Sequence, residues 1–144
     1  MRPGKPRPAI STSGARRARR LLVVEDECLI ALNLVEQLAE LGYVVIGPAF
    51  TMAEALHLAA VAAFDVAVVD LKLQGVFAGE VADILIRRQI PFLFVTGYSE
   101  VPDRKRYKNI AVLTKPVRTL DLQRAVEDVL AAYREAGSAK SMWM

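Results

Sequence analysis

The sequence predicts a doubly wound α/β fold in which a five-stranded parallel sheet is covered by helices on both faces. Short, wholly apolar runs alternate along the chain with segments whose apolar residues recur at helical spacing, and wholly apolar strands are typical of a parallel sheet buried on both faces. Apolar residues make up 53% of the 144 residues, enough for the core of one domain. Five strands suit the flavodoxin-like order 2-1-3-4-5.

Local signals set the limits of the expected elements. Thr51 and Glu54 have the spacing of a capping box, in which each side chain satisfies a free amide of the first helical turn. Gly42 and Pro91 mark the points where two helices end. The expected elements are, in chain order, strand 21–24, helix 28–41, strand 43–46, helix 51–63, strand 66–69, helix 78–88, strand 92–95, strand 110–113 and helix 120–134.

The segment 98–109 departs from this alternation. A doubly wound fold requires a helix between its fourth and fifth strands, but this segment contains Pro102, a run of charges and little apolar periodicity. We therefore expect a short, frayed or mobile helix here. The predicted architecture is a flavodoxin-like sheet with a degraded fourth helix.

Charge divides the chain into a basic beginning and a mildly acidic body. Residues 1–20 hold seven of the 19 basic residues and no acid, which leaves 12 basic and 16 acidic groups in the remainder. We expect residues 1–19 to be a disordered basic tail, because such compositions bury too little apolar surface to fold. Binding of nucleic acid or an anionic membrane by this tail is the alternative. Residues 20–135 form the domain, and residues 136–144 are a short C-terminal tail.

Composition also argues against several classes of protein. Cys28 is the single cysteine, so no disulfide forms within the chain, and one His with one Cys does not suit zinc. No apolar run approaches the roughly 20 residues needed to cross a bilayer, and no apolar stretch follows the basic start. We expect a cytoplasmic protein without membrane insertion. Nucleic-acid binding is not expected, because no helix-turn-helix signal follows the domain.

Polar residues collect directly after the strands. In an open parallel sheet, ligands bind beyond the carboxyl ends of the strands, where the strand order reverses. Glu25 and Asp26 follow the first strand, and Asp70 follows the third. Thr96 follows the fourth strand, and Lys115 follows the fifth. Three carboxylates are thus expected to meet at one edge of the sheet, flanked by a hydroxyl and an amine.

This combination of groups favours phosphoryl chemistry with a metal ion. Carboxylates this close raise one another's pKa, and a divalent cation relieves the repulsion. Mg²⁺ prefers oxygen ligands and typically takes one or two carboxylates together with phosphate oxygens. A carboxylate such as Asp70 can attack phosphorus and form an acyl phosphate, whose charge Mg²⁺ and Lys115 would balance. Thr96 would donate to a phosphoryl oxygen, and Gly97 leaves space for the incoming group.

These elements together resemble the receiver domain of two-component response regulators over about residues 21–134. The matching segments are 23–26, 68–70, 95–97 and 114–116. The resemblance implies a CheY-like fold and a phosphoacceptor that takes its phosphoryl group from a phosphohistidine on a histidine kinase or phosphotransfer protein. The resemblance implies that Asp70 is the phosphoacceptor. It implies that the Mg²⁺ ligands are Glu25, Asp26, Asp70 and the backbone carbonyl of Lys72. Thr96 and Lys115 are implied as phosphoryl-binding and switch residues, and the bond before Pro116 is implied to be cis.

A finer resemblance and one departure concern the switch itself. Residues 91–98 are similar to the FATGUY subgroup of mostly stand-alone receivers, which implies a partner kinase of the HWE or a related type. Most receivers carry Phe or Tyr three residues before the lysine, and its rotation reports phosphorylation, whereas this chain has Val112. Tyr98 is one candidate substitute. Ordering of segment 98–109 on phosphorylation is another.

The function expected from these residues is a single-domain response regulator. It would signal by phosphorylation-dependent partner binding, or act as a phosphate relay or sink, and would catalyse at most its own phosphorylation and dephosphorylation. The alternative is a pseudo-receiver that acts by protein contacts alone. An aspartate-based phosphohydrolase usually has a second aspartate two residues after the nucleophile, where this chain has Lys72. Formation of a homodimer is left open.

Overall fold

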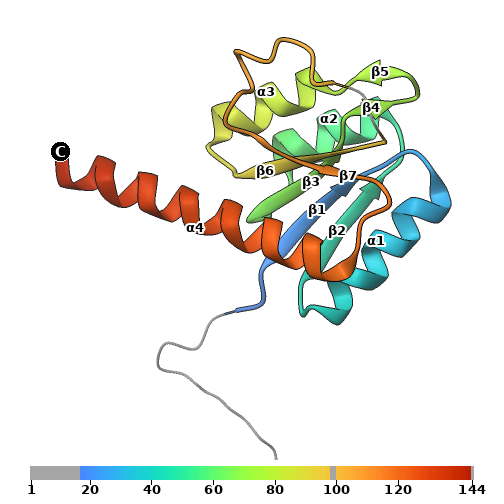
Figure 1. Cartoon of the computed structure of the whole chain (residues 1–144), viewed down its shortest axis with the longest axis horizontal. Helices are drawn as coiled ribbons and strands as arrows, with labels where there is room; N and C mark the ends of the chain where they lie inside the picture. The colour runs from blue at the N-terminus through green and yellow to red at the C-terminus, as the bar shows by residue number, and fades with distance from the viewer. Residues whose placement is uncertain (1–16, 98–99, 144) are drawn as a thin grey trace, which may run out of the picture.

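The computed structural model describes residues 17–97 and 100–143, and it describes side chains as far as residue 137. Five parallel strands form one sheet in the order β2-β1-β3-β6-β7 (Figure 1). This order confirms the flavodoxin-like arrangement predicted from the sequence. The strands are β1 (Arg20–Val24), β2 (Val44–Ala49), β3 (Val66–Asp70), β6 (Phe92–Thr96) and β7 (Ala111–Thr114).

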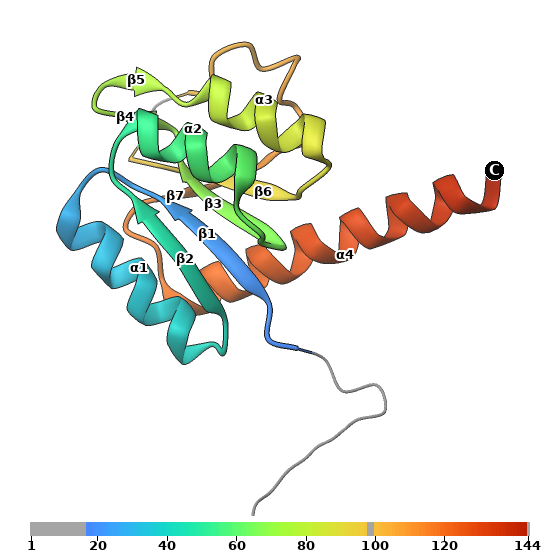
Figure 2. The same cartoon turned by 180° about the vertical axis from the view of Figure 1, so that it is seen from behind.

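Helices cover both faces of the sheet (Figures 1 and 2). The helices α1 (Cys28–Glu40) and α4 (Thr119–Trp143) pack on one face, and α2 (Met52–Val61) and α3 (Gly79–Arg88) pack on the other. Successive residues of β3 point to opposite faces, so that Val68 joins the core under α1 and α4 while Val69 joins the core under α2 and α3. All five residues of β3 are buried, which explains its continuous apolar sequence.

The capping box at the start of α2 is present. Thr51 Oγ1 accepts a hydrogen bond from the Glu54 amide at 3.1 Å, and Glu54 Oε1 accepts one from the Phe50 amide at 3.0 Å. One amide of the first turn and the amide just before the capping residue are thus satisfied by local side chains. The helix begins at Met52, one residue after its cap.

Strand β2 is longer than predicted. The sequence placed its end at residue 46, before Gly47 and Pro48, but the strand continues to Ala49 after a shift in its register with β1. Gly47 has φ +94°, and a Cβ there would lie 2.9 Å from the Ala49 amide nitrogen. Because β2 is an edge strand, it tolerates the proline that would disrupt a central strand.

A hairpin that the sequence analysis did not predict follows β3. It consists of β4 (Lys72–Leu73) and β5 (Val76–Phe77), which pair in antiparallel orientation. The turn residues Gln74 and Gly75 both have positive φ, at 50° and 81°. Strands of two residues are too short to produce an alternating pattern, so the sequence carries only the turn signal of the glycine.

The weak helix expected over residues 98–109 does not form in the described part of that segment. Residues 100–110 make a series of turns between β6 and β7. One side chain of this charged segment, Tyr107, is nevertheless buried in the core with 3% of its surface exposed. Tyr98 lies outside the described residues.

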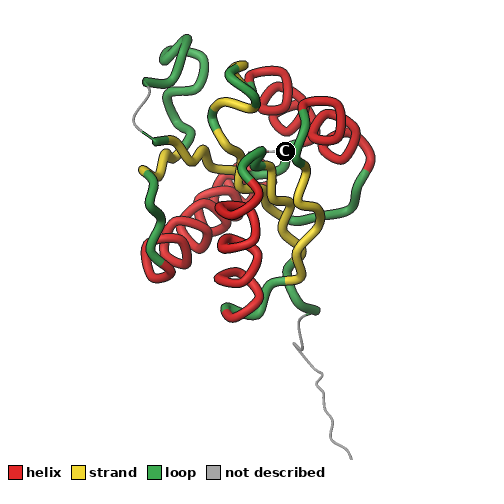
Figure 3. Tube along the Cα trace, turned by 90° about the vertical axis from the view of Figure 1, so that its right-hand side faces the viewer, coloured by secondary structure: helices red, strands yellow, loops and turns green. Residues whose placement is uncertain are grey.

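Helix α4 is longer than predicted. It was expected to end near residue 134, with a short tail over 136–144, but the helix continues to Trp143. Its first half packs on the sheet through Leu122, Val126 and Leu130, whereas its second half projects beyond the sheet (Figures 1 and 2). In Figure 3 the helices are seen on the two sides of the strands. The extension contains no proline, and its alanines, Lys140 and methionine favour helix.

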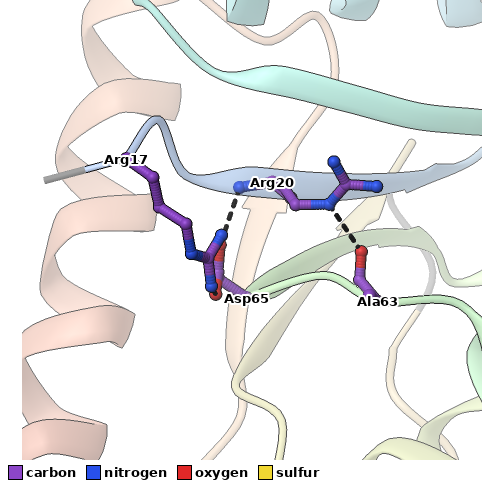
Figure 4. A network of polar contacts seen from close by, with 4 residues as sticks. All are labelled: Arg17, Arg20, Ala63 and Asp65. Atoms are coloured by element: carbon purple, nitrogen blue, oxygen red, sulfur yellow. Dashed lines mark hydrogen bonds and ion pairs between the residues drawn. The ribbon is translucent and has the colours of Figure 1, made fainter.

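The described chain begins at Arg17, inside the segment predicted to be a basic tail. Arg17 Nη2 lies 3.0 Å from Asp65 Oδ1, and the Arg20 amide donates to Asp65 Oδ2 at 2.8 Å (Figure 4). Arg20 Nε also donates to the carbonyl of Ala63 at 2.9 Å. These contacts order residues 17–19, so that the tail prediction applies to residues 1–16, outside the described residues. None of the described helices combines the length and apolar character needed to span a membrane.

Candidate functional site

The site is built at the carboxyl edge of the two central strands. Strands β1 and β3 pair in parallel, with Val24 in register with Val69, so the residues after these two positions are neighbours. Glu25 and Asp26 leave β1 at this edge, and Asp70 is the last residue of β3. One carboxylate oxygen from each of the three lies within 4.8 Å of the other two. The convergence that the strand ends predicted is therefore present.

Glu25 is the innermost acid. Its side chain is fully buried, and its Oε1 lies 2.8 Å from Lys115 Nζ. Its other carboxylate oxygen accepts a hydrogen bond from the Glu27 amide at 3.0 Å. The sequence grouped Glu25 with Asp26 as metal acids, and the Glu25 carboxylate contacts Lys115 while it also belongs to the cluster of three carboxylates.

Asp70 lies against this ion pair and is 7% exposed. Its Oδ2 is 3.5 Å from Lys115 Nζ, and its Oδ1 accepts a long hydrogen bond of 3.4 Å from the Lys72 amide. Burial is the main reason that the pKa of Asp70 is raised to about 7, and the negative charge of Glu25 raises it further, against the opposing effect of Lys115. An uncompensated negative charge is therefore unfavourable at this position.

Asp26 occupies the rim of the site. Its Oδ2 accepts a hydrogen bond from the Gln74 amide, in the turn of the hairpin, at 2.8 Å. Partial burial raises the pKa of Asp26, but the Gln74 hydrogen bond and the neighbouring side chains outweigh burial and leave that pKa below its usual value. Asp26 is thus ionised at neutral pH and accessible to a cation.

The hydroxyl and the amine come from the neighbouring strands. Thr96 ends β6 and is nearly buried, and its carbonyl accepts a hydrogen bond from the Lys115 amide at 2.7 Å. Burial lowers the pKa of the Lys115 amine, but Glu25 and Asp70 outweigh burial and raise that pKa above its usual value. The bond between Lys115 and Pro116 is cis, as the family resemblance implied.

Seven residues line an open pocket of about 360 Å³ at this edge: Asp26, Glu27, Asp70, Lys72, Thr96, Gly97 and Lys115. Glu25 forms its buried base, and Pro116 lines the adjoining hollow against α1. A side chain at Gly97 would meet nothing within 4 Å, in agreement with the open space expected there. The sequence analysis missed Glu27, although it is the third member of the acidic run that begins at Glu25.

The donor set of the pocket suits a hard divalent cation. The side chains that offer anionic ligands are carboxylates, and Lys72, whose backbone carbonyl the family resemblance implies as a further ligand, lines the same pocket. Oxygen donors with room for water are what Mg²⁺ prefers. Burial and, after it, the charge of Glu25 raise the pKa of Asp70, and a cation beside this carboxylate would favour its ionised form. The residues present therefore fit Mg²⁺.

The sequence matches the family model of the response regulator receiver domain over residues 21–127. The chain belongs to the response regulator receiver family. Such receivers are signalling switches of two-component systems, and they interact with a kinase or phosphotransfer partner. Membership therefore confirms the family that the sequence motifs indicated.

Curated relatives and solved structures agree with this membership. The chain is 33% identical over 123 residues to the transcriptional regulatory protein PdtaR of Mycobacterium tuberculosis, a match that covers 81% of this chain and 59% of that protein. It is 30% identical over 134 residues to the phyllosphere-induced regulator PhyR of Methylorubrum extorquens, covering 85% and 49%. The chain thus spans about half of the length of these relatives.

Two receiver structures show the same fold. A CheY-like receiver domain protein from Methanospirillum hungatei has a TM-score of 0.73 at 26% identity, with 83% of this chain and 99% of that chain covered. The receiver domain of a modulated diguanylate cyclase from Desulfovibrio desulfuricans has a TM-score of 0.74 at 32% identity, with the same coverage. The described domain therefore has the receiver fold.

Proposed function

We propose that this chain accepts a phosphoryl group on Asp70 from a histidine kinase or phosphotransfer protein, with Mg²⁺ bound at the same edge of the sheet. The observation that carries the proposal is the cluster of three carboxylates around one lysine at the switch point of the sheet. A cluster in which one carboxyl group is held near pKa 7 is poorly suited to a purely structural role.

Asp70 is the nucleophile in this proposal. One of its carboxylate oxygens attacks the phosphorus of a phosphohistidine, the new O–P bond forms, and the P–N bond breaks to release the imidazole, which takes up a proton. Mg²⁺, when bound, would neutralise charge on the phosphoryl oxygens. Asp26, Asp70 and the carbonyl of Lys72 would hold the cation, and Glu25 would contribute its charge from below.

Lys115 and Thr96 stabilise the product. Lys115 Nζ is 3.5 Å from Asp70 Oδ2, which places an ammonium group within reach of a phosphoryl oxygen on that atom. Glu25 positions this amine, because its fully buried carboxylate lies 2.8 Å away. Thr96 would donate its hydroxyl to another phosphoryl oxygen. Each of these roles uses charge or a hydrogen bond that is already at the edge of the sheet.

The surface beside the site supports a protein as the phosphodonor. Helix α1 begins two residues after Asp26, and its side chains Leu29 and Leu32 are 82% and 51% exposed. Exposed apolar side chains next to a reactive group favour the docking of a protein partner. The similarity of residues 91–98 to the FATGUY subgroup favours a kinase of the HWE or a related type. The chain would then act in the cytoplasm by partner binding, or as a phosphate relay or sink.

The decisive experiment is intact-mass spectrometry after incubation with acetyl phosphate and Mg²⁺. We expect the wild type to gain one phosphoryl group and Asp70→Asn to gain none. Asp65→Asn is the matched control, because it makes the same change at the other end of β3, and it should be phosphorylated like the wild type. A wild type that gains no phosphoryl group would support the pseudo-receiver alternative, and equal gains in wild type and Asp70→Asn would reject Asp70 as the acceptor.

A second experiment tests the partner class. Autophosphorylated kinases of the HWE type and of other types are each mixed with the chain and Mg²⁺, and transfer of the label is followed over time. The proposal expects faster transfer from the HWE type. Equal or faster transfer from the other types would reject the subgroup assignment while leaving the role of Asp70 intact.

A further inference from the structure

Segment 100–110 is anchored to the domain by one fully buried side chain. Tyr107 is 3% exposed, whereas the side chains of residues 102–106 and 108–109 are exposed. The amides of Arg106 and Tyr107 both donate to the carbonyl of Asp103, and the amide of Ile110 donates to the carbonyl of Tyr107. The turns are therefore wound around Tyr107, whose hydroxyl contacts Asp83 of α3.

The polar end of this anchor is Asp83 on α3. Tyr107 Oη donates to Asp83 Oδ1 at 2.8 Å, and Arg106 Nη2 lies 3.0 Å from the same oxygen. Both groups that reach Asp83 come from consecutive residues of the segment. One carboxylate oxygen thus connects the segment to α3.

The ring of Tyr107 completes an aromatic cluster with Phe77 and Phe94. Its centroid is 5.6 Å from that of Phe77 and 6.1 Å from that of Phe94, and both pairs have edge-to-face geometry. A Cβ at Gly79 would lie 2.6 Å from the Phe77 ring and 3.3 Å from Tyr107 Oη. The cluster is therefore tightly packed beside Gly79, so that a displacement of Phe77 would change the packing of Tyr107.

Phe77 connects this cluster to the acidic site. It is the last residue of the hairpin that begins at Lys72, two residues after Asp70. The turn of the same hairpin is held at the site by the bond of 2.8 Å from the Gln74 amide to Asp26 Oδ2. The hairpin thus touches a proposed metal ligand at its turn and Tyr107 at its end.

We propose that Tyr107 is the aromatic side chain that reports the state of the phosphorylation site in this chain. Engagement of Asp26 and Asp70 by the phosphoryl group and its cation displaces hairpin β4–β5 and Phe77, which withdraws Tyr107 from Asp83 and loosens segment 100–110. The inference rests on the proposed function of Asp70. It accounts for Val112, which is partly buried against the same cluster at the position where most receivers carry the reporting aromatic residue.

Hydrogen exchange tests the direction of this coupling. The wild type is measured with Mg²⁺ alone and with Mg²⁺ plus beryllium fluoride, a tetrahedral stand-in for the phosphoryl group. We expect exchange of the amides in 100–110 to become about fivefold faster with beryllium fluoride, a change typical of coupled sites. Unchanged or slower exchange in 100–110, with beryllium fluoride bound, would overturn the inference.

Variants test Tyr107 itself. Tyr107→Phe keeps the ring and its packing but removes the bond to Asp83, and Tyr133→Phe makes the same change on the exposed part of α4. Because coupling between two sites is reciprocal, Tyr107→Phe should bind beryllium fluoride about fivefold more tightly in a calorimetric titration. Its segment 100–110 should also exchange faster before the ligand is added. Equal affinity of Tyr107→Phe, Tyr133→Phe and wild type would overturn the inference.

The same titration separates a failure of this inference from a failure of the proposed function. If wild type binds no beryllium fluoride in the presence of Mg²⁺, the proposed phosphoacceptor site is wrong, and the role of Tyr107 is rejected with it. If wild type binds beryllium fluoride and Asp70→Asn does not, the site stands. The exchange and affinity results for Tyr107 then decide the inference on their own.

Discussion

Two aspartates at opposite ends of strand β3 have opposite environments. Asp65, just before the strand, accepts hydrogen bonds from Arg17 and from the Arg20 amide, and these outweigh burial and hold its pKa below the usual value (Figure 4). Asp70, at the other end, is raised to a pKa of about 7 because burial and the charge of Glu25 outweigh Lys115. The environment therefore stabilises the aspartate charge at one edge of the sheet and destabilises it at the other.

The difference separates a structural edge from a functional one. At the amino edge, Asp65 has its partners within the described chain, so these contacts add stability. At the carboxyl edge, three carboxylates lie together and one lysine pairs with two of them, an arrangement that a divalent cation would stabilise. The open pocket lies at this carboxyl edge, where the Asp70 charge is destabilised. Replacement of the two aspartates by asparagine should therefore have opposite effects on stability.

The largest expected effect compares the two cations that face these aspartates. Lys115→Met leaves the fully buried Glu25 without its ammonium partner, and breaking a buried pair in this way costs about 3 kcal/mol of unfolding free energy. Arg17→Met removes an exposed cation and should cost about 0.5 kcal/mol. Urea unfolding at pH 8 without divalent metal measures both. Equal costs for the two variants would remove the distinction between the edges.

The next effect concerns Asp65. Asp65→Asn replaces a charged acceptor of three hydrogen bonds and should cost about 2 kcal/mol at pH 7. A carboxyl group whose pKa is lower in the folded state than in the unfolded state stabilises the fold at pH values above its unfolded pKa. This stabilisation is lost as the pH falls through the folded-state pKa. The cost should therefore shrink as the pH falls below about 4, the ordinary value of an unfolded aspartate. A cost that is the same at pH 7 and pH 3 would contradict the role of the charge, and Asp128→Asn on α4 is the exposed control.

The smallest effect has the opposite sign. The pKa of Asp70 is raised in the folded state. Its contribution to the free energy of unfolding is therefore fully present below the unfolded pKa of about 4 and is lost as the pH rises through 7. Asp70→Asn should thus increase the unfolding free energy by about 1 kcal/mol at pH 8 in metal-free buffer, with no gain near pH 4. Thermal unfolding at the two pH values measures this. A variant less stable than wild type at pH 8 would show that Asp70 is not strained.

Sequence patterns predicted the position of the site because its residues are defined by strand ends. The apolar runs that end at Val24 and Asp70 are local signals, and the topology rule for parallel sheets then brings their ends to one edge. The different environments of the residues within the site could not be predicted in the same way. Glu25 and Asp26 are adjacent, yet one is fully buried against Lys115 and the other lies on the rim, a difference of packing depth alone.

The remaining differences from the predicted fold arise from contacts between distant parts of the chain. Tyr107 is a single aromatic residue in a charged segment, and its partner Asp83 is 24 positions away, so no local pattern indicates its burial. The hairpin after β3 is too short to have a period, and it is held in place by Asp26 rather than by its own strands. Helix α4 extends past the expected end because no residue in the described extension breaks it.

The most direct test of the account is a carboxyl NMR titration of Asp65 and Asp70 in one sample, first without and then with Mg²⁺. The account predicts that Asp70 titrates near pH 7 without metal and that Asp65 titrates below its ordinary value of 3.8. Mg²⁺ should lower the midpoint of Asp70 and leave that of Asp65 unchanged. An Asp70 that titrates like an exposed aspartate and does not respond to Mg²⁺ would contradict the account.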